Sequence, residues 1–160
     1  MIYLLDSNIF ITSKINLPFD VYPSFWQAVS KLSHSGQFKS IKRVENELRK
    51  GKDEIVTWID NELPKDFFIE EDTHTISALS SVSQWANLNS VYSDAAKNQF
   101  VSVADSWLVA EALAQSCTVV TFEKSQPNCK TRVKIPDVCD ALGIKYCSLN
   151  DAFRALGVTI

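Results

Sequence analysis

Ile2-Tyr3-Leu4-Leu5 runs directly into Asp6-Ser7-Asn8, so an acid follows an apolar run of strand length. Open α/β sheets bind their ligands outside the carboxyl ends of the strands, and a carboxylate at this position is well placed to hold a metal ion. The same aspartate could instead cap a following helix, because aspartate is a common N-cap residue. The choice between these interpretations depends on whether other acids reach the same edge of the sheet.

Four more short runs of β-type residues follow along the chain, which gives expected strands at residues 2–5, 38–41, 67–69, 118–122 and 144–147. Helical spacing of apolar residues fills the segments between them, at residues 24–32, 44–59, 73–88 and 105–115. Gly51 would break the second of these helices, and two shorter helices are expected after Pro136 and Ser148. This alternation predicts a three-layer α/β/α fold around a central parallel sheet of about five strands.

The segment between the third and fourth expected strands is longer than one crossover needs. Roughly 72 to 116 should therefore hold two or three helices, with the extra ones packed at one edge of the sheet. Gly143 is a natural stop for the helix that Pro136 begins. The length of 160 residues and the lack of repeats or linkers predict a single domain, 1–160.

The composition is that of a soluble globular protein, with 46% hydrophobic and 22% charged residues. No apolar stretch approaches the roughly 20 residues that span a bilayer, and no export signal is visible at the N-terminus. We therefore expect a cytoplasmic protein with no membrane contact. The four cysteines are irregularly spaced without a C-x-x-C pair, which argues against a zinc site and favours free thiols.

The net charge is −3, but ten of the sixteen basic residues lie in two short windows. The first window contains Lys39, Lys42, Arg43, Arg49, Lys50 and Lys52, and the second contains Lys124, Lys130, Arg132 and Lys134. Each window could be an ordinary solvated surface or a surface that binds phosphate groups. The sequence leaves both interpretations open.

Three further acids occupy positions comparable to that of Asp6. Glu47 lies on the helix after the second strand, Glu123 directly follows the fourth strand, and Asp105 opens the helix before it. Parallel strands end at one edge of a sheet, so Asp6, Glu47 and Glu123 should lie close together, with Asp105 if its helix begins there. Each has a simpler alternative: the two aspartates could be helix caps, and the two glutamates could be exposed surface residues.

Carboxylates that share one edge repel each other unless a cation neutralises them. A hard divalent ion with oxygen ligands, Mg²⁺ or Mn²⁺, is the natural partner, and such ions support in-line displacement at a phosphoryl group. Flanking basic residues would hold a polyanionic substrate. Arg43, Lys124 and Arg132 are the candidate phosphate contacts.

Four short patterns contain the acids: strand-Asp6-Ser7-Asn8, Val44-x-x-Glu47-Leu48, Ala104-Asp105-x-x-Leu108-Val109-Ala110 and Val119-Val120-Thr121-x-Glu123. Their order and spacing resemble a PIN domain, and the resemblance covers nearly the whole chain. The closing segment at 133–139 resembles a PIN-like subfamily of uncharacterised bacterial proteins.

The resemblance implies a metal-dependent endoribonuclease that hydrolyses RNA, which in bacteria is often the toxin of a toxin–antitoxin pair. Carried over by position, the catalytic residues and ligands of Mg²⁺ or Mn²⁺ would be Asp6, Glu47, Asp105 and Glu123. Ser7 or Asn8 would help to place Asp6 or a metal-bound water. The implied partners are an RNA substrate, a cognate antitoxin and a second copy of the chain in a homodimer.

Two positions keep alternatives open. Glu45 competes with Glu47, although the Glu-Leu pattern of the family favours Glu47. Glu123 stands where many PIN domains carry an aspartate, so the alternative function is a catalytically weak PIN-like scaffold that binds RNA or protein. Trp107, next to Asp105, is interpreted as a core or lid residue rather than one that stacks on a base.

Overall fold

A computed structural model describes all residues 1–160 and contains one sheet of five parallel strands in the order β3-β2-β1-β4-β5. All five expected strands are confirmed, each within its expected run. Their bounds are β1 Tyr3–Leu5, β2 Phe38–Ile41, β3 Phe68–Ile69, β4 Thr118–Val120 and β5 Tyr146–Cys147.

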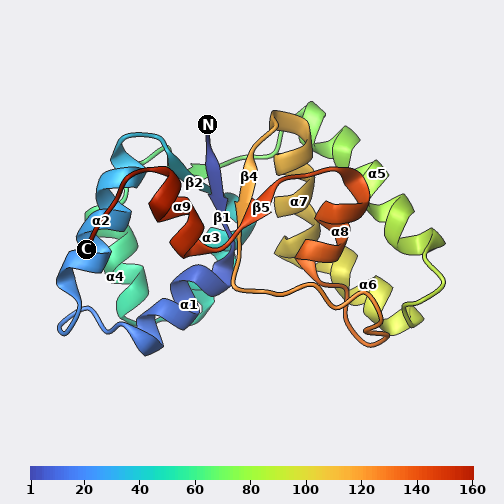
Figure 1. Ribbon diagram of the computed structural model, residues 1–160, viewed down its shortest axis with the longest axis horizontal. Helices are drawn as coiled ribbons and strands as arrows, with labels where there is room; N and C mark the ends of the chain where they lie inside the picture. Colours follow the sequence, from blue (N-terminus) through green and yellow to red (C-terminus); the bar gives the residue numbers. More distant parts are fainter.

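Helices cover both faces of this sheet, which confirms the expected three-layer α/β/α class. In Figure 1, α2, α4 and α9 lie on one side of the strands, and α5 to α8 lie on the other. Within the second group, α7 packs on the strands, while α5 and α6 pack against α7. The helices are α1 Ser7–Asn16, α2 Pro23–His34, α3 Lys42–Lys50, α4 Glu54–Glu62, α5 Thr73–Leu88, α6 Asp94–Ser102, α7 Ala104–Gln115, α8 Ile135–Leu142 and α9 Leu149–Ala155.

The two central strands set the position of the acids. Leu4, Leu5, Val119 and Val120 are completely buried, as expected of strands that are covered on both faces. The pairing of β1 with β4 continues past the end of β1, because the Asp6 N–H donates to the Val120 carbonyl at 3.0 Å. The order of the strands reverses between β1 and β4, which is the place where sheets of this type bind ligands.

Helix α1 was not anticipated as a helix of its own. Its β-branched residues have low helix propensity, and apolar residues occupy both of its sides: Ile9 and Phe10 are buried, whereas Ile11 and Ile15 are exposed. The helical period is therefore hidden in the sequence. Packing against α3 stabilises this helix, as tertiary contacts do for most helices in proteins.

The remaining helix boundaries follow local signals. Gly51 ends α3 and separates it from α4, as expected, and Asp53 caps α4 by accepting a hydrogen bond from the Ile55 N–H. Ser148 caps α9 through the Asp151 N–H. All four cysteines are free thiols, two of them buried and two partly buried, as expected. None of the helices combines the length and apolar character that crossing a membrane requires.

Gly143 ends α8 in the left-handed conformation, with φ +69°. We expect Gly143→Ala to lower the free energy of unfolding by about 1 kcal/mol, because only glycine adopts this conformation without strain. No atom lies within 4 Å of an added Cβ, so the cost is conformational. Urea denaturation measures it. Gly51→Ala is the control, since φ is −68° there and an added Cβ would meet only Asp53 Oδ2, at 3.3 Å, more closely than an ordinary van der Waals contact. An equal loss in both variants would contradict the conformational explanation.

Candidate metal centre at the carboxyl edge of the sheet

Asp6 lies directly after β1 and is only 3% exposed. It occupies the N-cap position of α1, yet its side chain makes no capping hydrogen bond. Instead, the Thr121 hydroxyl donates to Asp6 Oδ2 at 2.8 Å, and the Ser7 hydroxyl lies 3.4 Å from Oδ1. The capping interpretation is therefore wrong for this side chain, which is oriented by groups from the ends of two strands.

Thr121 connects the residues around Asp6. Its Oγ1 accepts hydrogen bonds from Asn8 Nδ2 at 3.2 Å and from the Glu123 N–H at 3.1 Å. The side-chain oxygen of Asn8, Oδ1, in turn accepts a hydrogen bond from the Phe122 N–H at 3.2 Å. Strand β4 ends at Val120, two residues before the expected end, although the Thr121 N–H still donates to the Cys147 carbonyl at 3.2 Å. Asn8 therefore contacts Asp6 only indirectly, through Thr121. The sequence analysis did not single out Thr121 as a site residue. Its hydroxyl group, two residues before Glu123, was the signal that could have identified it.

Glu47 and Glu45 point to different parts of the molecule. Glu47 Oε1 accepts a hydrogen bond of 3.3 Å from the N–H of Ala104, the first residue of α7. Glu45 pairs with Lys42 and Arg49, each at 2.9 Å. Burial opposes ionisation of Glu45, but the hydrogen bonds from both cations outweigh it and lower its pKa. The structure therefore places Glu47, and not Glu45, beside the other acids.

Asp105 lies in the first turn of α7, where the N-cap residue is Val103 and no side chain caps the helix. The capping alternative for Asp105 is therefore wrong. Burial raises the pKa of Asp105 from its ordinary 3.8 to about 7, and repulsion from Asp6, Glu123 and Glu47 adds to the rise, against a smaller opposing effect of Arg132. The four acids therefore face the same edge of the sheet and influence one another electrostatically, and they are called the acidic cluster below.

The pKa of Asp6 is raised in the same way, to about 6. Burial is the largest cause, and the carboxylates of Glu123 and Glu47 contribute, while the hydrogen bond from Thr121 counteracts them. The protein therefore compensates the charged forms of the two aspartates only in part.

Glu123 has polar partners of its own. Its side chain is 10% exposed, Oε2 accepts from the Ile135 N–H at 2.8 Å, and Oε1 lies 3.2 Å from the Arg132 guanidinium. These bonds tie the end of β4 to the first residue of α8. Arg132, a candidate phosphate contact, thus stands beside an acid of the cluster.

The two basic windows differ in their surroundings. In the first, Arg43 pairs with Glu71 at 2.9 Å and stacks on the Trp107 ring at 3.8 Å. Ion pairs also bind Lys39, Lys42 and Arg49 of this window. In the second window, none of the ion pairs of the structure involves Lys124, Lys130 or Lys134. The partly buried Trp107 of α7 packs under the Arg43 guanidinium of α3. Lys50 and Lys52 of the first window are unpaired as well, but the three unpaired lysines of the second window are the ones that follow Glu123 along the chain.

The family match can now be set beside this geometry. Residues 3–160 match the family described as "Domain of unknown function (DUF4411)". The chain belongs to the DUF4411 family. That description states no activity, and searches of curated proteins and of solved structures found no match. Any function of this DUF4411 chain must therefore be argued from the site itself.

The oxygen atoms of the four clustered carboxylates are suitable ligands for a hard divalent cation. All four side chains offer carboxylate oxygens, which Mg²⁺ and Mn²⁺ prefer, and the raised pKa values of Asp6 and Asp105 reflect charge that a cation would neutralise. In the present arrangement no three acids, histidines or cysteines lie close enough to hold an ion together. Glu47 and Glu123 accept hydrogen bonds from the backbone N–H groups of Ala104 and Ile135. Their side chains would have to rotate toward Asp6 and Asp105 to share an ion.

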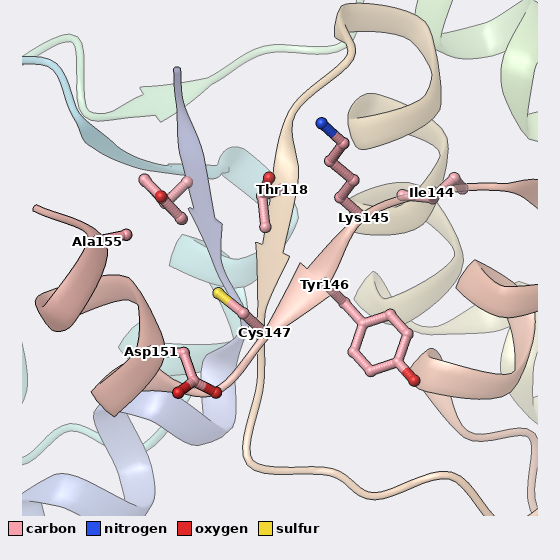
Figure 2. Close-up of a pocket in the computed structure, with 8 residues that line it drawn as sticks. Thr118, Ile144, Lys145, Tyr146, Cys147, Asp151 and Ala155 are labelled. Carbon is pink, nitrogen blue, oxygen red and sulfur yellow. The ribbon is translucent and has the colours of Figure 1, made fainter.

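A separate cavity of about 480 Å³ opens between β5 and α9. Figure 2 shows Thr118 and Cys147 on the strands, with Asp151 and Ala155 on α9 across the gap. The Tyr146 ring points the other way, toward α8, where its hydroxyl donates to Asp140 at 3.3 Å. None of the four clustered acids lines this cavity, so it is not part of the candidate metal centre.

Proposed function

We propose that this DUF4411 chain is a Mg²⁺- or Mn²⁺-dependent endoribonuclease of the PIN-like type that hydrolyses RNA phosphodiester bonds. The observation that carries the proposal is the placement of four acids toward the carboxyl edge of the sheet, where burial and then mutual repulsion raise the pKa of Asp6 and of Asp105. Open parallel sheets bind their ligands at the carboxyl ends of the strands, where the strand order reverses.

The residues of the cluster take complementary roles. A bound divalent cation would supply positive charge that polarises the phosphoryl group and acidifies a water molecule. Asp6, fixed by Thr121, and Asp105, with no capping role, are the principal ligands. The pKa of Asp105 is about 7 without a cation, and a cation bound beside it would lower that pKa and hold the carboxylate in its charged form near neutral pH. Glu47 and Glu123 complete the acidic side of the site.

The loop after β4 offers the complementary surface for the substrate. Lys124 directly follows Glu123, and Lys130 and Lys134 lie further along the same loop without ion-pair partners. Positive side chains beside an acidic centre hold the phosphates that flank the bond to be cut, and their binding weakens with salt. This distribution favours a polyanionic substrate.

The direct test is cleavage of RNA by the purified protein, with structured and unstructured substrates and with Mg²⁺, Mn²⁺ or EDTA. We expect cleavage that requires the ion and that is lost in Asp6→Asn. Glu45→Gln is the matched control, because Glu45 lies on α3 but faces Lys42 and Arg49, and it should retain activity. Absence of cleavage with every divalent ion would refute the proposal.

We further propose that the nuclease acts in the cytoplasm as the toxin of a toxin–antitoxin pair, with an antitoxin that covers the acidic edge, and that the chain forms a homodimer. These expectations come from the PIN resemblance. A small reading frame for a DNA-binding protein beside the gene would support them. Growth arrest on induced expression, relieved in the Asp105→Asn variant, would support them more directly.

The second candidate function is a catalytically weak scaffold that binds RNA or protein. The contacts of Glu123 favour it, because the Arg132 guanidinium and the Ile135 N–H already occupy this carboxylate. Calorimetric titration with Mn²⁺ separates the two functions. Weak binding that does not change in Asp6→Asn would support the scaffold, and tight binding that this substitution abolishes would support the nuclease.

A further inference from the structure

A second cavity, of about 360 Å³, lies on the far side of the loop that follows β4. The end of α5 contributes Trp85 and Asn89, the next segment contributes Tyr92, the loop contributes Ser125 and Pro127, and α8 contributes Asp140. Its volume falls within the range of about 300–1,000 Å³ that is usual for small-ligand sites. Nothing in the proposed nuclease mechanism uses these residues.

Two aromatic rings form one wall of this cavity. The Trp85 and Tyr92 rings lie 5.9 Å apart at an interplanar angle of 65°, with Tyr92 buried behind the partly buried Trp85. A rigid indole that is backed by a second ring and partly open to solvent is suited to stacking on a nucleic acid base.

The polar groups at the cavity favour one base. Asp140 is exposed and accepts only one hydrogen bond, from the Tyr146 hydroxyl, so it has free acceptor positions. The side-chain oxygen of Asn89, Oδ1, accepts a hydrogen bond from the Val91 N–H, which leaves the side-chain NH₂ group of Asn89 as the free donor. An acceptor carboxylate beside an amide donor complements guanine, which presents two adjacent N–H donor groups next to its O6 acceptor. Adenine presents an acceptor where guanine presents a donor.

The loop between the cavity and the acidic cluster is held at both ends. Asp137 of α8 accepts from the Ser125 hydroxyl and, at 3.0 Å, from the Gln126 N–H, while the Ser93 N–H donates to the Lys130 carbonyl at 2.9 Å. Figure 1 shows this segment running from the end of β4 toward α6 and α8.

The loop after β4 is short, so the cavity and the acidic cluster lie close enough for one nucleic acid strand to contact both. Ser125 and Pro127 follow Glu123 by two and four residues, so at most about 14 Å of chain separates the cavity from the acids. A single strand of nucleic acid with one phosphate at the acids can therefore reach the cavity within a few nucleotides. Lys124 and Lys130 stand along this path.

We propose that the cavity between α5 and α8 binds a guanine base of single-stranded RNA a few nucleotides from the bond that is cut. The inference rests on the proposed function and adds a base preference to it. Trp85 stacks on the base, Asp140 accepts from its N–H groups, and Asn89 donates to its O6. The unpaired lysines of the loop hold the intervening phosphates, and a polycationic partner would be repelled by them.

The test uses the full chain with the Asp105→Asn substitution, so that RNA is bound but not cut. Binding of a short oligouridylate that contains a single guanosine is compared with binding of the same oligonucleotide with adenosine. We expect about 10-fold tighter binding of the guanosine form, within the range known for good base contacts. Asp140→Asn should abolish this preference while retaining an oxygen that accepts from Tyr146. Asp20→Asn, an exposed acid on another surface, should leave it unchanged.

Free guanosine monophosphate and arginine amide, titrated separately by calorimetry, distinguish the ways in which the proposal can fail. Equal binding of both oligonucleotides, with cleavage by the unmodified chain intact, would overturn the guanine site and leave the nuclease standing. Failure to bind or cut any RNA would overturn both. Tighter binding of arginine amide than of guanosine monophosphate, sensitive to Asp140→Asn, would assign the cavity to a cationic partner instead. Trp85→Leu provides a second variant and should weaken binding of the guanosine oligonucleotide.

Discussion

Asp105→Asn should reduce RNA cleavage by at least about 100-fold, because residues that merely support a metal ligand already account for 10- to 100-fold. The substitution preserves the shape of the side chain and removes its charge. Asp105 neither caps α7 nor pairs with a cation, so its carboxylate remains available for a ligand. Single-turnover cleavage with Mn²⁺ measures the loss.

The same substitution should make the metal-free protein more stable at pH 8. The pKa of Asp105 is about 7 in the folded protein and near 3.8 when unfolded, so the folded state holds its proton more tightly. Ionisation therefore costs folding free energy as the pH rises through 7, and the cost is absent below about pH 4. We expect Asp105→Asn to raise the free energy of unfolding by about 1–3 kcal/mol at pH 8, less than the full shift implies because the side chain is partly exposed.

Thermal unfolding in EDTA at pH 8 and pH 4.5 checks this gain, which should be several-fold smaller at the lower pH. Asp94→Asn is the matched control, because Asp94 is an exposed acid in the first turn of α6 and favours that helix when charged. It should lower stability slightly and leave cleavage unchanged. A loss of both stability and activity in Asp105→Asn would instead identify Asp105 as a structural residue.

The sheet could be predicted because its signals are local. Short apolar runs such as residues 2–5 and 118–122 are strands buried on both faces, and their alternation with helical patterns leaves few arrangements. The edge on which the acids converge follows from the direction of parallel strands. Helix α1 could not be found in this way, because packing rather than residue propensity or period stabilises it.

The details of the site depend on orientations that no local pattern contains. Glu45 and Glu47 lie on one helix two residues apart, and only the packing of α3 between α4 and α7 decides which of them meets Ala104. Likewise, the two basic windows look alike in the sequence. They differ because acids, some from distant segments such as Asp66 and Glu71, pair with Lys39, Lys42, Arg43 and Arg49 of the first window. In the second window only Arg132 is paired.

RNA cleavage and Mn²⁺ binding should both fall steeply as the pH decreases from 8 to 5. The cation requires charged carboxylates, and the pKa values of about 7 for Asp105 and about 6 for Asp6 mean that the pair becomes protonated within this interval. The loss should approach 10-fold per pH unit just below pH 7 and 100-fold per unit below pH 6, which amounts to about 10³-fold in affinity at pH 5. Calorimetric titration of the apo protein with Mn²⁺ at several pH values measures it.

Thr121→Val tests whether the pH dependence of Mn²⁺ affinity arises from Asp6. The Thr121 hydroxyl donates to Asp6 and lowers its pKa, so its removal should shift the fall in affinity toward higher pH. Thr118→Val is the matched control, because Thr118 lies at the opposite end of β4 and its hydroxyl contacts only Met1. Its profile should match that of the unmodified chain. An affinity for Mn²⁺ that stays constant down to pH 5 would show that the ion binds without Asp6 and Asp105, because a protonated carboxyl group cannot provide the charge that a divalent cation requires.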